Sequence, residues 1–108
     1  MPLLEDIVEL GVDGLVVEQP RRGYSTDPGE IRRIVGNGLC VYGWSPEWAM
    51  IQGDRQTISK TIETQIRGAG MDGAFVMGST YLTNEVSCET VDFFCDEVAR
   101  VSGELHLR

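Results

Sequence analysis

This sequence contains few of the residues that bind nucleic acids or anionic surfaces. Among its 108 residues there are 9 Lys or Arg and 17 Asp or Glu, which gives a net charge of −8. Sequence-independent nucleic-acid binding depends on clustered Lys and Arg, and so does electrostatic attraction to anionic membranes. The charge balance therefore predicts that neither nucleic acid nor a membrane surface is a partner.

Metal ligands and disulfide pairs are also scarce. There is one histidine, His106, and the three cysteines Cys40, Cys88 and Cys95 show no C-x-x-C spacing. We expect all three thiols to be reduced, with Cys95 on the apolar stripe of a helix, and a cytoplasmic location follows from that redox state. We expect no metal site and no cofactor in this chain.

Targeting and membrane signals are missing as well. No run of residues approaches the roughly 18 apolar positions that a membrane-spanning helix needs. The first residues, Met1-Pro-Leu-Leu-Glu-Asp, lack the basic region of a signal peptide.

The sequence does contain a strand–helix unit that occurs three times. Short apolar runs behind a glycine predict strands at 14–18, 38–42 and 73–77, and each run is followed by a helical pattern. Alternating strands and helices predict parallel strands with right-handed crossovers. The predicted fold class is α/β, a partial TIM (β/α)8 barrel with about three parallel strands in sequential order. Residues 1–108 are expected to form a single segment of such a barrel, because a whole barrel needs roughly 250 residues.

Helix starts and stops are marked clearly in the sequence. A helix over 2–10 precedes the first strand. Asp27 and Pro28 predict the N-cap and first turn of the next helix, and Asp54 and Ser87 predict the N-caps of the last two. A helical turn is expected at 49–51. Gly103 is predicted to end the final helix, with a frayed tail over 104–108.

Candidate ligand-binding residues follow the three strands, because functional groups in parallel α/β folds gather where strands end. Glu18 could act in acid/base chemistry or contact a ligand, or it could be only the polar residue at the end of the buried strand. Arg21 and Arg22 could bind a carboxylate or phosphate through two hydrogen bonds, or they could belong to a solvated loop. Trp44 suits an apolar pocket, together with Trp48, or packs beneath a loop. The full set of predicted ligand-binding residues is Glu18, Gln19, Arg21, Arg22, Trp44, Ser79, Thr80 and Tyr81.

The order of these segments resembles a known family. Glu18-Gln19, then Asp27-Pro28-Gly29-Glu30, then Gly38-Leu-Cys-Val-Tyr-Gly43-Trp44-Ser45-Pro46 are followed by a capped helix after Gly53, by Gly73-Ala-Phe-Val-Met-Gly78 and by Glu89-Thr90-Val91. Together they resemble the C-terminal part of the uroporphyrinogen decarboxylase superfamily, which includes cobalamin- and coenzyme M-linked methyltransferases. The resemblance implies a (β/α)8 barrel, of which this chain would form roughly the last three strands.

The sequence departs from that family at its reactive positions. The decarboxylases have a histidine after the last strand and the methyltransferases a zinc-binding cysteine, where this chain has Gly78-Ser79-Thr80. The family's Gly-Asn-x-Asp-Pro turn appears as Gly43-Trp44-Ser45-Pro46, and the decarboxylase arginines and catalytic aspartate belong to the family's N-terminal half. No catalytic residue is therefore assigned, and whether the chain is an enzyme stays open.

Three functional hypotheses remain from the sequence. The first is a fragment or truncated relative of a uroporphyrinogen decarboxylase-like or corrinoid-linked methyltransferase enzyme, inactive alone, whose intact form would bind an anionic small molecule. The second is a small α/β protein that binds a phosphorylated ligand through Gly78-Ser79-Thr80. The third is a structural subunit that completes a barrel. Because three strands leave apolar surface uncovered, we expect self-association or a barrel-completing chain as the partner.

Overall fold

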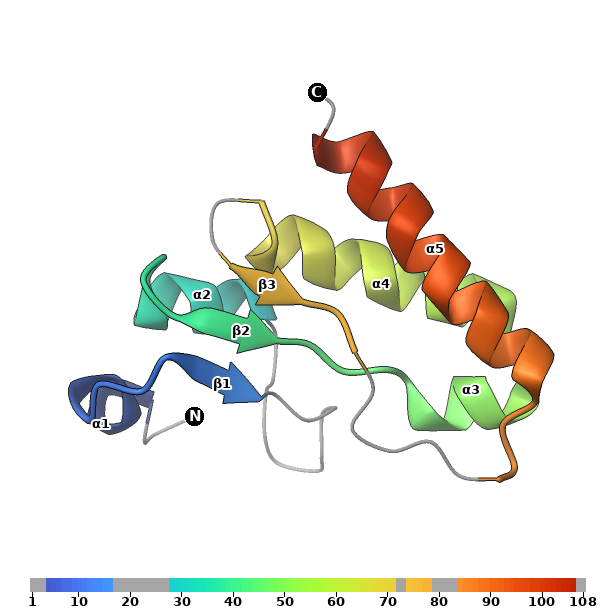
Figure 1. Ribbon diagram of the computed structural model, residues 1–108, viewed down its shortest axis with the longest axis horizontal. Coiled ribbons are helices and arrows are strands. Elements are labelled where there is room, and N and C mark those ends of the chain that lie inside the picture. Colours follow the sequence, from blue (N-terminus) through green and yellow to red (C-terminus); the bar gives the residue numbers. More distant parts are fainter. Residues whose placement is uncertain (1–3, 17–27, 72–73, 79–83, 107–108) are drawn as a thin grey trace.

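The computed structural model describes residues 4–16, 28–71, 74–78 and 84–106. In chain order the elements are α1 (Leu4–Glu9), β1 (Gly14–Val16), α2 (Pro28–Val35), β2 (Cys40–Tyr42), α3 (Glu47–Gln52), α4 (Arg55–Ala69), β3 (Phe75–Val76) and α5 (Cys88–His106). They form a mixed α/β structure with three strands and five helices (Figure 1).

The three strands form one open parallel sheet in the order β1-β2-β3. In register, Val16 pairs with Tyr42 and Tyr42 with Val76. The predictions of parallel strands and of sequential order are confirmed. β1 begins at Gly14 as predicted, and its predicted last residues, 17 and 18, lie outside the described part of the chain. β2 and β3 are shorter than the predicted 38–42 and 73–77, because β2 begins at Cys40 and β3 contains only Phe75 and Val76.

Helices α2 and α4 form a second layer on one side of the sheet, and α5 packs against α4. Helix α4 packs against both α2 and α5, and α2 and α4 lie behind the strands in Figure 1. The sheet residues that point toward this layer are buried or half-buried: Leu15, Leu39, Val41 and Phe75.

The core consists of two clusters of buried apolar side chains. One lies between α1, α2 and the sheet and contains Leu4, Ile31, Val35, Leu39 and Val41. The other lies between α3, α4 and α5 and contains Ala49, Met50, Ile58, Ile62, Ile66, Phe94, Val101 and Leu105. Phe75 contacts both clusters, so β3 joins the two halves of the core.

The predicted helix starts agree with the structure where it describes them. Asp54 caps α4, because its carboxylate accepts hydrogen bonds from the Thr57 backbone N at 3.2 Å and from Thr57 Oγ1 at 2.7 Å. Ser87 caps α5 by accepting a bond from the Thr90 backbone N at 3.1 Å. Helix α2 begins at Pro28 as predicted, and its predicted cap Asp27 lies outside the described residues.

Two helix predictions were wrong. Gly103 does not end α5, which continues to His106, because Leu105 packs into the core and stabilises the last turn. Cys95 is exposed rather than on the apolar stripe of α5. Spacing alone did not distinguish the buried stripe of a long helix from its margin.

The other side of the sheet has no helix over it among the described elements. Side chains alternate between the two faces of a strand, so this side presents Gly14, Val16, Cys40, Tyr42, Ala74 and Val76, a set called the open face from here on. Val16, Tyr42 and Val76 are 57%, 42% and 43% exposed. No residue of the open face is charged.

Candidate functional site

The carboxyl ends of the three parallel strands lie along one edge of the sheet, where the sequence predicted ligand-binding residues. Of those residues the structure describes Trp44, in the loop that follows β2. The remaining predicted residues lie outside the described part of the chain, so their mutual placement is not tested: Glu18, Gln19, Arg21, Arg22, Ser79, Thr80 and Tyr81.

The loop after β2 begins with a glycine that no other residue can replace without rearrangement. The Gly43 backbone N donates a hydrogen bond to the Val76 carbonyl at 2.8 Å, which extends the β2–β3 pairing by one residue. A Cβ on Gly43 would lie 2.6 Å from Gln65 Oε1 and 2.8 Å from Phe75 Cζ, both far inside van der Waals contact. The start of the loop is therefore fixed between α4 and β3.

A buried glutamine of α4 holds the next residue of the loop. The Trp44 backbone N donates to Gln65 Oε1 at 2.9 Å, and Gln65 Nε2 donates to the Trp44 carbonyl at 2.6 Å. The side-chain amide thus pairs with the backbone as a neighbouring strand would. Gln65 was missed from the sequence, because helical periodicity does not show which backbone groups lie opposite the residue beside Ile66.

The Trp44 indole is half-buried and contacts the cluster that contains Val41. It lines a shallow hollow of about 190 Å³ together with Lys60, Thr61, Thr64 and Gln65. Trp44 Nε1 is buried and has no acceptor among the described residues. Trp48, predicted to share an apolar pocket with Trp44, instead lies 70% exposed on α3.

A buried arginine lies at the opposite edge of the sheet, where the strands begin. Arg32 Nε donates to the Ala69 carbonyl at 3.1 Å, and Nη1 donates to the Gly36 and Leu39 carbonyls at 2.9 and 2.6 Å. Nη2 donates to the Ala74 carbonyl at 2.5 Å. Because its partners are carbonyls of α4 and of the residues before β2 and β3, Arg32 joins the two layers and has a structural role.

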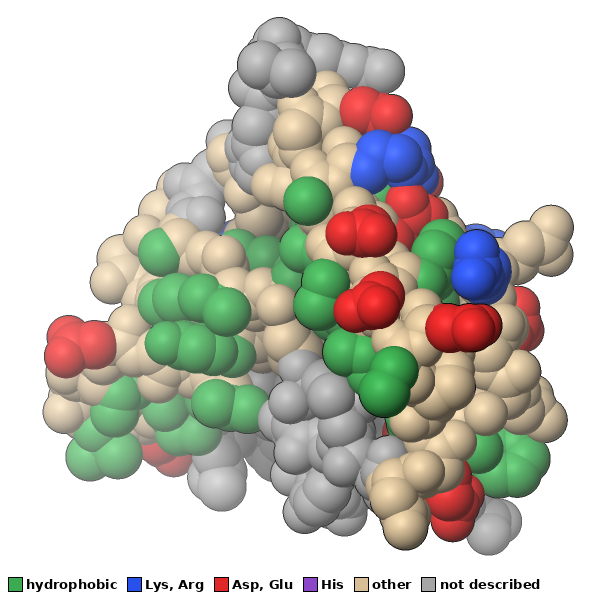
Figure 2. All heavy atoms as spheres, turned by 45° about the vertical axis from the view of Figure 1, so that its right-hand side comes forward, with side chains coloured by type: hydrophobic (Ala, Val, Ile, Leu, Met, Phe, Trp, Pro, Cys, Tyr) green, Lys and Arg blue, Asp and Glu red, His purple; other side chains and the backbone are tan. Residues whose placement is uncertain are grey.

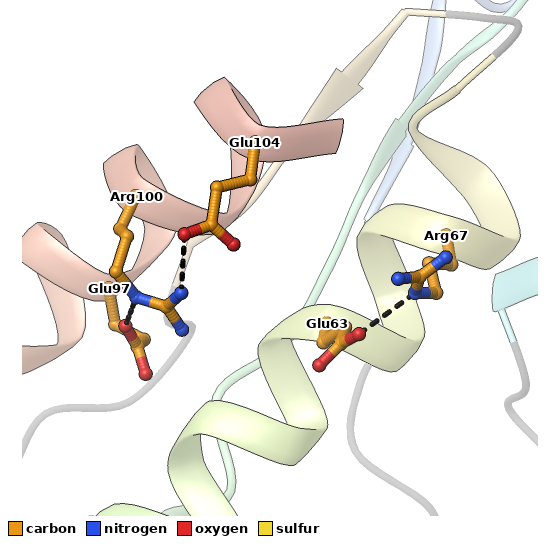
Figure 3. Close-up of polar contacts among 5 residues, drawn as sticks. All are labelled: Glu63, Arg67, Glu97, Arg100 and Glu104. Atoms are coloured by element: carbon orange, nitrogen blue, oxygen red, sulfur yellow. Dashed lines mark hydrogen bonds and ion pairs between the residues drawn. The ribbon is translucent and has the colours of Figure 1, made fainter. Parts of the chain in front are cut away.

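The ion pairs of the described residues lie on helices α4 and α5, away from the strand ends. Arg100 of α5 donates to Glu97 at 2.5 Å and to Glu104 at 2.9 Å, and Arg67 of α4 donates to Glu63 at 2.9 Å (Figure 3). Hydrogen bonds from Arg100 and, secondarily, from Ser59 lower the pKa of Glu97. The hydrogen bonds that Arg100 donates to Glu97 and, secondarily, to Glu104 raise the pKa of Arg100.

The capping contact has a similar effect on Asp54. Hydrogen bonds from the Thr57 hydroxyl and backbone N lower the pKa of this exposed carboxyl. It lies at the start of α4 and faces solvent rather than the open face or the Trp44 hollow. The shifted carboxyls in the described residues are thus explained by helix contacts, and none of them identifies a catalytic acid or base.

Within the described residues no group of three or more His, Cys, Asp or Glu side chains is arranged to hold a metal ion. None of the helices over the same ranges is long and apolar enough to cross a bilayer.

No protein-family model matches this sequence, and no curated protein matches it either. The resemblance to the uroporphyrinogen decarboxylase superfamily therefore depends on the residue pattern alone.

Proposed function

We propose that this chain supplies three neighbouring (β/α) units of a uroporphyrinogen decarboxylase-like barrel and has no catalytic activity alone. In this proposal other strands pair with β1 and β3 and cover the open face. The completed barrel would bind an anionic small molecule at the carboxyl ends of the strands, as barrel enzymes do.

One observation supports the proposal more than any other: the sheet has helices on one side and an uncharged, partly exposed surface on the other. Successive right-handed crossovers in a sequential parallel sheet place their helices on the same side. A barrel interior is filled by apolar side chains from its own strands. Val16, Tyr42 and Val76 have the character that such an interior requires.

The loop after β2 supports a ligand site at the strand ends. Gly43 and Gln65 fix its backbone, and a fixed backbone can position a side chain against a ligand without a large loss of entropy. The proposed ligand contacts are Trp44 and the predicted residues of the two flanking loops, Glu18, Gln19, Arg21, Arg22, Ser79, Thr80 and Tyr81. The family histidine and cysteine are missing, so no catalytic role is proposed for any residue.

Complementation tests this proposal. A barrel has eight strands and this chain has three, so the complement is the first five (β/α) units of a uroporphyrinogen decarboxylase-like enzyme, expressed as a separate chain. Native mass spectrometry of the mixture should show a 1:1 complex. A porphyrin titration followed by absorbance should show binding by the complex and none by this chain alone.

Two results would count against the proposal. One is the absence of a complex although both chains are folded by circular dichroism. The other is stoichiometric binding of a sugar phosphate by this chain alone, which would favour a self-standing protein that binds a phosphorylated ligand through Gly78-Ser79-Thr80.

A further inference from the structure

The hollow beside Trp44 offers a binding site that needs no strand from another chain, because its described walls are the loop after β2 and helix α4. We propose that this hollow binds a small aromatic carboxylate. The ring of the ligand lies against the Trp44 indole, and its carboxylate accepts hydrogen bonds from Lys60 and from a neighbouring threonine hydroxyl.

The aromatic wall of the hollow is held in a fixed position. The Trp44 backbone forms two hydrogen bonds with the Gln65 side chain, at 2.9 and 2.6 Å. The Trp44 side chain contacts the core cluster that contains Val41 and also lines the hollow. An aromatic surface that is already positioned loses little entropy when a flat ring stacks on it.

The polar side chains of α4 at the hollow are available to a ligand. Lys60 and Thr64 are exposed, Thr61 is half-buried, and no hydrogen bond or ion pair joins these three side chains to another described residue. Lys60 and Thr64 are one helical turn apart, so their side chains are neighbours on α4. An ammonium beside a hydroxyl is a donor pair that suits a carboxylate.

The indole itself has an unsatisfied donor. Trp44 Nε1 is buried and has no acceptor among the described residues. A buried donor without a partner destabilises the structure, so a ligand oxygen that bonds to it gains affinity. This N–H group also reports on the site, because its proton resonance responds to a ligand on the ring.

Local charge favours an anion at this site, although the whole chain is acidic. None of the residues that line the hollow is acidic, and the one carboxylate of α4, Glu63, is paired with Arg67 at 2.9 Å. In Figure 2 several Asp and Glu side chains gather instead over the helix at the right, which is α5. Because salt screens exposed charges beyond about 8 Å, the ammonium of Lys60 outweighs carboxylates farther away.

The size of the hollow selects a single ring. Its volume is about 190 Å³, and an engineered cavity of about 150 Å³ takes up benzene. Since the hollow is shallow, we expect a dissociation constant of about 1–10 mM. A tetrapyrrole is much too large for it, so this site and the barrel proposal are tested with different molecules.

Titration of the isotope-labelled chain with benzoate, followed by nuclear magnetic resonance, tests the site. The chain has two tryptophans, and Trp48→Phe assigns their indole N–H resonances. The Trp44 resonance should shift and saturate, whereas that of Trp48, 70% exposed on α3, should not. Benzamide, which has the same shape and no charge, should bind at least about fivefold more weakly.

A pair of variants tests the role of Lys60. Lys60→Met removes the ammonium and keeps a long side chain, so benzoate should bind at least about fivefold more weakly while benzamide binding is unchanged. Arg33→Met is the matched control, because it removes the same charge from an exposed position on α2 and should leave both affinities unchanged. Circular dichroism checks that both variants are folded.

The absence of a saturable shift of the Trp44 resonance with benzoate would overturn the site. Equal affinities for benzoate and benzamide would contradict carboxylate recognition, and equal losses in Lys60→Met and Arg33→Met would contradict a contact with Lys60. Each of these results leaves the barrel proposal intact, and failure to form a complex with the five-unit complement leaves this site intact.

Discussion

Single polar side chains in buried positions hold the two layers together. Gln65 and Arg32 both bond to backbone groups of other elements, and the sequence alone indicated no role for either residue. A periodicity argument identifies which helix positions are buried, but it does not show which carbonyl or amide lies opposite. These contacts therefore could not be predicted from the sequence.

The Gln65 contact predicts a large loss of stability on substitution. Gln65→Leu keeps the side-chain volume but leaves the Trp44 backbone N and carbonyl without partners, which should lower the free energy of unfolding by about 2–4 kcal/mol. Gln56→Leu on the exposed side of the same helix should change it by less than about 0.5 kcal/mol. Urea denaturation measures both, and equal midpoints would contradict this account of Gln65.

Arg32 predicts a similar contrast with its neighbour. Arg32→Met removes a charged donor from four backbone carbonyls and should cost at least about 3 kcal/mol of unfolding free energy. Arg33→Met, on the exposed side of α2, should have little effect. Thermal melting by circular dichroism compares them. Arg32 would have no structural role if the two variants melted at the same temperature.

The lowered pKa of Glu97 predicts an acid-sensitive contribution to stability. A carboxyl whose pKa is lower in the folded than in the unfolded state stabilises the fold above its ordinary value of 4.5, and this stabilisation is lost as the pH falls through the lowered pKa. Glu97→Gln should therefore lose less stability than the unaltered chain between pH 7 and pH 3. Urea denaturation at both pH values measures the difference, and identical losses would show that Glu97 does not contribute.

At the scale of elements, the existence and order of the strands and helices were predicted from the sequence, whereas several of their first and last residues were not. The three strands, their order and the capped starts of α4 and α5 were predicted, because glycine-flanked apolar runs and cap residues are local signals. The C-terminal end of α5 was not predicted, because it depends on a tertiary contact of Leu105 that outweighs the local effect of Gly103. Of the larger predicted site, the structure describes the loop after β2, which contains Trp44.

The continuation of α5 predicts that its last turn contributes to the core. Leu105→Ala should lower the free energy of unfolding by about 2–3 kcal/mol, because the side chain is buried in the cluster between α4 and α5. Leu10→Ala is the matched control, since Leu10 is 78% exposed, and should change it by less than about 0.5 kcal/mol. A frayed C-terminal turn would instead make the two substitutions equivalent in chemical denaturation.

At the scale of the whole molecule, the central feature is a sheet with two unlike faces. One face lies against α2 and α4, and the described residues of the other face are uncharged and partly exposed. The apolar residues in all three strands indicated that both faces of the sheet would be apolar. They did not show which residues would lie on which face. Phe75, for example, contacts both core clusters and belongs to the covered face, so Val76 is the residue of β3 that tests the open face.

The most direct measurement of this central claim is the affinity of the five-unit complement for a matched pair of variants. Val76→Asp places a charge on the open face, and Ile34→Asp places the same charge on the outer side of the helix layer. Calorimetric titration should show that Val76→Asp weakens binding at least about tenfold while Ile34→Asp binds as the unaltered chain does. Equal affinities for the two folded variants would contradict the claim that other strands cover the open face.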